Sequence, residues 1–165
     1  MSHPVKKNEL LADIIQRAFT SSRYPGDARL VFDNSGGDLE CTQVAHAFKG
    51  KQWSDLSVSF LRLYPDSLFF LSPEAYWFYL PAYLLASVLS YRCADIITSN
   101  VVYSLTPPAN KGSERDCFDA KIQGFSPEQR AAIKAFLEFL QCEHAGDFPF
   151  GDVEIALDRY WRSAG

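Results

Sequence analysis

Two acidic segments contain side chains of the types that bind metal ions. The spacing of these side chains decides whether a metal site can form. Glu143, His144 and Asp147 carry ligand atoms, but they lack the second histidine of the H-E-x-x-H zinc motif. The acidic, glycine-rich loop that begins at Asp33 resembles a calcium loop in composition. Its fifth position is Gly37, however, where a calcium loop needs an oxygen ligand. Both patterns fail, so we predict no metal site and no cofactor.

The usual nucleophile and phosphate-binding motifs are also absent from the sequence. None of G-x-x-x-x-G-K-[ST], G-x-G-x-x-G and G-x-S-x-G occurs. The four cysteines lie far apart without a C-x-x-C pair, which favours reduced thiols over a zinc or redox site. A Cys–His pair could still meet in the fold, so an enzyme stays an open alternative to which no catalytic residue is assigned.

Acidic side chains form two stretches that could recognise a basic partner. Residues 24–40 carry four carboxylates against one arginine, a local charge of −3. Residues 141–158 carry five carboxylates and no lysine or arginine, a local charge of −5. If the two stretches share a face, that face attracts cations and can occupy a cleft meant for phosphate. The alternative is that both are ordinary solvated surface.

The second acidic stretch also contains two aromatic residues, Phe148 and Phe150, in a Gly-Asp-Phe-Pro-Phe-Gly-Asp turn. Aromatic side chains often dominate the energetics of protein interfaces, so both are candidate anchors. The alternative is that they pack into the core and fix the turn. The predicted partner-binding residues are Asp33, Asp38, Glu40, Glu143, Asp147, Phe148, Phe150, Asp152 and Glu154.

The composition restricts the kind of chain that carries these residues. The 165 residues are 47% hydrophobic and 15% aromatic, which is too apolar for a disordered chain and fits one domain over residues 1–165. We expect residues 1–7 to be a flexible tail. The net charge of −4 argues against nucleic-acid binding, which needs a basic surface. Without a signal peptide pattern, we expect a cytoplasmic protein.

Hydrophobic spacing and helix-capping residues predict a mainly α fold of about six to seven helices, with at most one short strand or hairpin near residues 28–32. The apolar stripe expected for the first helix includes Leu10 and Ile14. Asp55 is the expected cap of the third helix, and residues 94–105 give no clear pattern. The predicted helices cover residues 8–20, 38–49, 55–64, 73–89, 113–122, 126 to about 140, and 152–162.

The helix that begins after Ser72 is expected at the centre of the fold, because it is apolar on nearly every face. Its uncharged run, residues 75–89, is 15 residues long, and a membrane span needs about 20, so we predict no membrane insertion. Pro81 removes a backbone hydrogen bond and should kink or split the helix near Trp77. Tyrosines on either side of Pro81 could line a pocket.

Several of these motifs together resemble a bacterial helical domain family of unknown function. They are Tyr-Pro-Gly-Asp at residues 24–27, Phe-Leu-Ser-Pro-Glu-Ala-Tyr-x-Phe-Tyr-Leu-Pro-Ala-Tyr-Leu at 70–84, and Phe-Ser-Pro-Glu-Gln-Arg-Ala-Ala at 125–132. The resemblance implies a compact helical domain and brings no agreed activity. In size, acidity and lack of an active site, the chain is similar in character to immunity proteins, which neutralise toxins delivered between competing bacteria.

The leading hypothesis is therefore an immunity-type inhibitor that occludes a cognate toxin, plausibly a basic nuclease delivered by type VI secretion. Its acidic side chains would lie where the toxin expects phosphates. One alternative is a small enzyme or ligand-binding domain with its site near Pro81. A second alternative is a structural or regulatory subunit that works as an oligomer. The sequence leaves the oligomeric state open.

Overall fold

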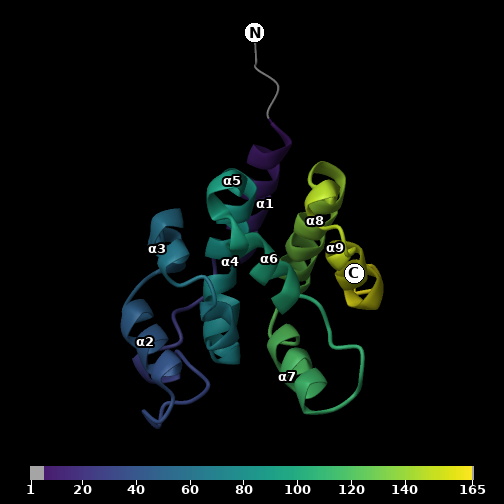
Figure 1. The fold of residues 1–165 in the computed structure, drawn as a ribbon. Coiled ribbons are helices and arrows are strands. Elements are labelled where there is room, and N and C mark those ends of the chain that lie inside the picture. Colours follow the sequence, from purple (N-terminus) through teal and green to yellow (C-terminus); the bar gives the residue numbers. More distant parts are fainter. Residues whose placement is uncertain (1–5, 165) are drawn as a thin grey trace.

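The computed structural model describes residues 6–164, and its regular structure there is helical apart from one isolated β-bridge. The mainly α prediction is confirmed (Figure 1). Within the described range there are nine α-helices, more than the six to seven predicted. They are α1 (Lys7–Phe19), α2 (Leu39–Phe48), α3 (Val58–Leu63), α4 (Pro73–Leu89), α5 (Tyr91–Ala94), α6 (Ile96–Ser104), α7 (Ser113–Ile122), α8 (Pro127–Glu143) and α9 (Asp152–Ala156).

The tail expected over residues 1–7 lies mostly outside the described residues, which begin at Lys6. The part that is described is not a tail, because Lys6 occupies the N-cap of α1 and Lys7 is its first residue. Lys7 Nζ also donates to Glu143 Oε1 at 2.8 Å, which joins the start of α1 to the end of α8.

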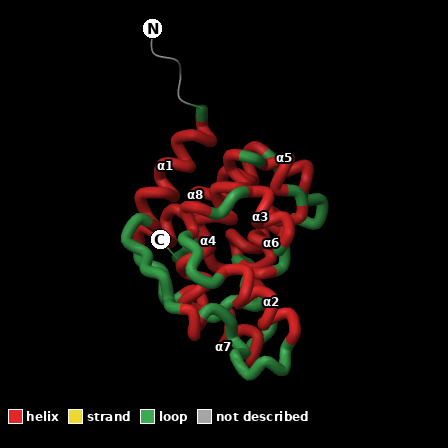
Figure 2. The backbone as a smooth tube through the Cα atoms, turned by 90° about the vertical axis from the view of Figure 1, so that its left-hand side faces the viewer, coloured by secondary structure: helices red, strands yellow, loops and turns green. Residues whose placement is uncertain are grey.

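The central position of α4 follows from its uniformly apolar surface. Twelve of its 17 residues are buried, and it packs against α1, α5, α6 and α7. Its start is built as the sequence predicts, with the Ser72 hydroxyl accepting from the Ala75 N–H at 3.1 Å. α1 lies between α4 and α8 and contacts both, so helices from opposite ends of the sequence close one core (Figures 1 and 2).

Pro81 does not split α4, which continues from Pro73 to Leu89. The tyrosines that flank the proline do not line a pocket either. Tyr76, Tyr79 and Tyr83 are all fully buried in the core. The Tyr79 hydroxyl donates to the backbone carbonyl of Lys51 at 2.7 Å, so this ring joins α4 to the loop after α2.

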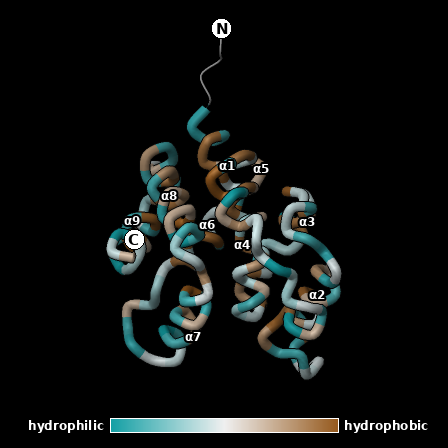
Figure 3. The backbone as a smooth tube through the Cα atoms, turned by 180° about the vertical axis from the view of Figure 1, so that it is seen from behind, coloured by the Kyte–Doolittle hydropathy of each residue, from teal (hydrophilic) through white to brown (hydrophobic). Residues whose placement is uncertain are grey.

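The apolar stripe predicted for the first helix is only partly buried. α1 buries Leu11, Ala12, Ile15 and Phe19, whereas Leu10 is 56% exposed. The adjacent leucine pair and the adjacent isoleucine pair allow two choices of buried face. The helix buries the second residue of each pair and exposes the first. Figure 3 shows the resulting brown, hydrophobic residues along α1 and the teal loop before α7.

Other boundaries also differ from the prediction. Ser57 caps α3, so the expected cap Asp55 was wrong and instead lies in a 3₁₀ turn. Near residues 28–32 there is no strand, only a 3₁₀ turn and a bridge between Val31 and Leu71. The stretch without a clear pattern, residues 94–105, contains α6 and the last residue of α5, and the two helices are separated at Asp95, a non-glycine residue with φ of +52°.

Candidate functional surfaces

The first acidic stretch is a surface loop whose aspartates already have local roles. Asp33 Oδ1 accepts from the Ser35 N–H at 2.9 Å, and the hydrogen bonds from Ser35 lower the pKa of Asp33. Asp38 caps α2 by accepting from the Cys41 N–H at 2.9 Å. Glu40 is exposed in the first turn of α2. Reversing the charge of Asp38 would therefore disturb the helix start as well as the surface.

Two carboxylates of the second stretch make side-chain contacts with earlier helices. Glu143 forms the ion pair with Lys7, which lowers the pKa of Glu143 through the hydrogen bond and the charge of the lysine. Asp147 Oδ2 accepts from the Tyr91 hydroxyl at 2.9 Å. The ring of His144 stacks on Tyr91 with 3.5 Å between ring centroids, so this end of α8 is attached to α5.

The two candidate aromatic anchors have opposite environments. Phe148 is 8% exposed and belongs to the hydrophobic core, so it fixes the turn. Phe150 is 85% exposed, the most exposed large hydrophobic side chain of the described chain. Burying a phenylalanine side chain is worth roughly 1.5–3 kcal/mol relative to leaving it in water. Phe150 is therefore the better candidate for contact with a partner.

A pocket of about 390 Å³ lies beside this turn, between α6 and α9. Tyr103, Asp152 and Ile155 are among its lining residues, and Tyr103 is 74% exposed. Arg159 also lines this pocket, whereas Phe150 lies in the adjoining turn outside the lining. We name the group Tyr103, Phe150, Asp152 and Ile155 the α6–α9 surface. Glu154 lies on the opposite side of α9, since residues two apart on a helix are separated by roughly 200°.

The structure does not bring the two acidic stretches together. The first stretch leads into α2, and the second leads into α9. Figures 1 and 3 place α2 and α9 on opposite sides of α4. A partner that contacts the second stretch therefore meets a separate surface from the first. Sequence reasoning could mark both stretches but missed Tyr103, which only the fold brings next to α9.

Metal-ligating side chains do not gather anywhere in the described chain. Across residues 6–164 no group of three or more His, Cys, Asp or Glu residues could hold a metal ion.

Three of the cysteines, Cys93, Cys117 and Cys142, are exposed, and Cys41 is buried. Every helix between residues 6 and 164 is too short or too polar to cross a membrane.

Another pocket runs along the second half of α4, close to Pro81. It has a volume of about 630 Å³, and all of its lining residues are uncharged. α4 contributes one wall of the pocket with Ala82, Leu85 and Leu89. The opposite wall includes Trp53 and Leu56. The buried tyrosines expected there take no part in the lining. This pocket has the size of a small-molecule site but contains no acid, base or nucleophile other than serine and threonine hydroxyls.

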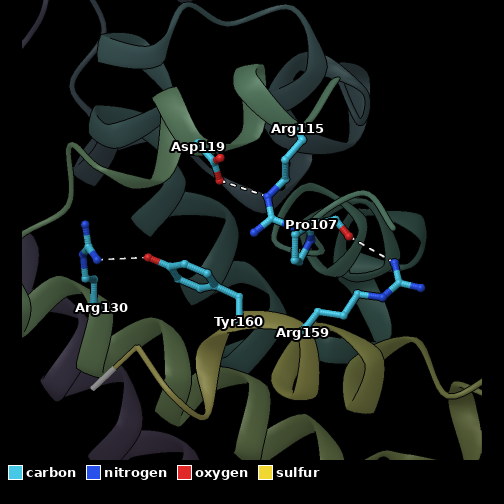
Figure 4. Close-up of polar contacts among 6 residues, drawn as sticks. All are labelled: Pro107, Arg115, Asp119, Arg130, Arg159 and Tyr160. Carbon is cyan, nitrogen blue, oxygen red and sulfur yellow. Dashed lines mark hydrogen bonds and ion pairs between the residues drawn. The ribbon is translucent and has the colours of Figure 1, made fainter. Parts of the chain in front are cut away.

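Three arginines near the C-terminal end hold helices together (Figure 4). Arg130 Nη1 donates to the Tyr160 hydroxyl at 3.0 Å, and Arg159 Nη1 donates to the Pro107 carbonyl at 3.1 Å. Arg115 Nε donates to Asp119 Oδ1 at 3.1 Å. Arg115 thus pairs within α7, whereas Arg130 and Arg159 fix the π-helical turn at residues 157–161 against α8 and the loop after α6.

The comparisons with known proteins match the chain to one family. The model of the family described as "Family of unknown function (DUF6714)" matches residues 6–164. No curated protein and no solved structure matches the chain.

Proposed function

Since the chain belongs to the DUF6714 family of unknown function, whose description supplies no activity, we propose its function from its surface. The chain is a protein-binding module that docks a basic partner on the α6–α9 surface. The partner is a toxin whose active or substrate-binding site becomes covered, as with immunity proteins, and a nuclease delivered by type VI secretion is the leading example. The module works in the bacterial cytoplasm.

The observation that carries this proposal is the exposed Phe150 in an acidic turn. A partner that covers the ring removes apolar surface from water, and its cations can pair with the flanking carboxylates. Asp152 and Glu154 are exposed and have no lysine or arginine within 4.0 Å in the described chain. These carboxylates remain free to attract cations, whereas Glu143 is occupied by Lys7.

The proposal is tested by co-expressing the chain with the product of the adjacent gene and measuring the affinity of the purified pair. We expect a stoichiometric complex in which the toxin activity is inhibited. Phe150→Ala and Asp152→Lys should each weaken binding at least tenfold, because one removes the anchor and the other reverses a charge beside it. A chain that stays alone, with no effect on the toxin, would refute the inhibitor proposal.

Matched controls come from the other acidic stretch. Leu39 is 69% exposed and Glu40 is exposed, so Leu39→Ala and Glu40→Lys repeat the same kinds of change on the far side of α4. We expect both to leave the affinity unchanged. If Glu40→Lys abolishes binding and Asp152→Lys does not, the interface is the loop with Asp33, Asp38 and Glu40, and our choice of surface is wrong.

A second candidate function is a ligand-binding domain, which the 630 Å³ pocket along α4 favours. Its lining is uncharged, so a ligand there would be neutral, with an apolar side against Leu85 and Trp53. The test is a thermal-shift screen of neutral compounds, with Leu85→Trp as a variant that fills the pocket. A compound that stabilises the native chain but not this variant would support the candidate.

A further inference from the structure

A smaller pocket, distinct from the α6–α9 surface, has a composition that points to a specific ligand class. It has a volume of about 400 Å³ and lies where residues 21–29 pass between the first turn of α4 and the connection from α7 to α8. Three of the sequence motifs meet here, because the lining includes Tyr24, Glu74 and Gln129. Arg23, Arg29 and Trp77 complete the part of the lining that matters chemically.

The two arginines of this pocket differ from those of Figure 4 in having no partner. Within residues 6–164, the side chains of Arg23 and Arg29 make no hydrogen bond, and no carboxylate lies within 4.0 Å of either. Glu74 is exposed and likewise unpaired in the described chain. Two guanidiniums and one carboxylate leave the pocket with one positive charge in excess, although the whole chain carries −4.

The walls of the pocket are fixed by contacts elsewhere in the protein. The Trp77 indole lies against Gly124 and donates its N–H to the Lys121 carbonyl. The Tyr24 hydroxyl donates to Asp27 Oδ1 at 2.5 Å and accepts from the Gly50 N–H at 2.8 Å. A ligand therefore meets aromatic walls that are already ordered, which lowers the entropy cost of binding.

The Gln129 side chain is also occupied. Its Nε2 donates to the Ser22 hydroxyl at 3.2 Å, and its Oε1 accepts from the Ser126 N–H at 3.0 Å. The strong unoccupied donors that line the pocket are thus the guanidiniums, each with five N–H groups in a planar fork. That fork matches the oxygens of a carboxylate or a phosphate.

We propose that this pocket binds a small anion in which a phosphate or carboxylate group is attached to a flat apolar part. The anionic group pairs with Arg23 and Arg29, and the flat part packs against Trp77. This inference is independent of the proposed protein interface. It assigns a ligand to a site whose residues come from three segments that are far apart in the sequence.

The test uses phenyl phosphate, benzoate and phenol as probes, titrated into the wild-type chain by isothermal calorimetry. Phenyl phosphate and benzoate differ only in the anionic group, so their ranking shows which anion the pocket prefers. Phenol has the ring but no charge at neutral pH, so it should bind at least tenfold more weakly than the better anion. Binding of phenol as tight as that of both anions would overturn the proposal.

Arginine variants show whether the binding occurs at this pocket. R23Q and R29Q should each weaken the better anion about tenfold, and the double variant should abolish measurable binding, because each removes a charge-assisted contact. R62Q is the matched control, since Arg62 is an exposed arginine on α3 outside the pocket. The proposal fails if the wild-type chain binds neither anion at millimolar concentration, or if the double variant binds as R62Q does.

Glu74 provides a variant with the opposite expected sign. E74Q removes the only negative charge among the lining residues named above, so it should tighten anion binding several-fold. A general loss of structure would weaken binding instead of strengthening it, and circular dichroism melts of all variants verify that the fold is kept. Weaker binding by a folded E74Q would contradict the charge arrangement on which the proposal depends.

Discussion

At the scale of single residues, Gly124 shows how closely one side chain can constrain a backbone position. A Cβ at Gly124 would collide with the Trp77 indole. Trp77 cannot easily move away, because its N–H is bonded to the Lys121 carbonyl. The absence of a side chain at residue 124 is thus required by a ring from α4, and not by an unusual backbone angle.

Gly124→Ala should destabilise the fold by about 1–3 kcal/mol, the usual cost of inserting a carbon into a tightly packed site. The measurement is the free energy of unfolding from urea denaturation. Gly146→Ala is the matched control, since a Cβ there meets nothing within 4 Å. We expect the control to be neutral or slightly stabilising, because alanine restricts the unfolded chain more than glycine does. Equal stability of the two variants would mean that Trp77 rearranges freely.

At the scale of elements, the helix starts show what local sequence can determine. The Ser-Pro-Glu motifs at residues 72–74 and 126–128 each predict a helix start, and both are confirmed, with the reciprocal capping box of Ser126 and Gln129. These interactions span three residues, so nothing distant decides them. Asp55 and Ser57 offered two such caps close together, and core packing of α3 selected Ser57.

Ser72 does more than cap a helix, so the two serine caps should differ in a measurable way. Its hydroxyl accepts from the Ala75 N–H and donates to the Arg29 carbonyl at 2.5 Å. Ser72→Ala should cost about 2 kcal/mol, because it loses the cap and leaves a carbonyl unpaired. Ser126→Ala should cost about 1 kcal/mol, since it loses the cap alone. Urea denaturation of both variants compares these values, and a smaller loss for Ser72→Ala would contradict the dual role.

The parts of the fold and sites that sequence could not predict depend on distant elements. Leu10 and Leu11 are equivalent by type, and only the positions of α4 and α8 decide that Leu11 is buried. The separation of the acidic stretches depends on α4 lying between α2 and α9 (Figure 1). The pocket with Arg23 and Arg29 joins segments that only the whole fold brings together.

At the scale of the whole molecule, the tyrosines connect stability to pH. Burial raises the pKa of Tyr76, Tyr79 and Tyr83 above the usual value. Desolvation, followed by the hydrogen bond to Asp147, raises the pKa of Tyr91 to about 12. In the unfolded chain these hydroxyls lose their protons near pH 10, whereas in the folded chain they keep them. Above pH 10 the unfolded chain therefore binds fewer protons, and stability falls as pH rises.

Burial also raises the pKa of the Cys41 thiol, so the free energy of unfolding should begin to fall gently around pH 8–9 and should fall steeply between about pH 10 and pH 12. Urea denaturation at a series of pH values measures this slope. Tyr76→Phe removes one of the contributing groups. The difference in bound protons between the folded and unfolded chains should therefore shrink by up to one, and the slope should become shallower. A stability that does not change up to pH 11 would show that the tyrosines ionise equally in both states.

The packing of α1 against α8 also has a consequence for how the protein is made. α1 leaves the ribosome well before its partner α8, because six other helices are translated between them. Trp161, fully buried and donating to the Leu105 carbonyl at 2.7 Å, follows later still. The side of α1 that packs on α8 therefore stays uncovered until α8 has been translated. A ribosome that stalls before Trp161 would present an incomplete core to chaperones and proteases.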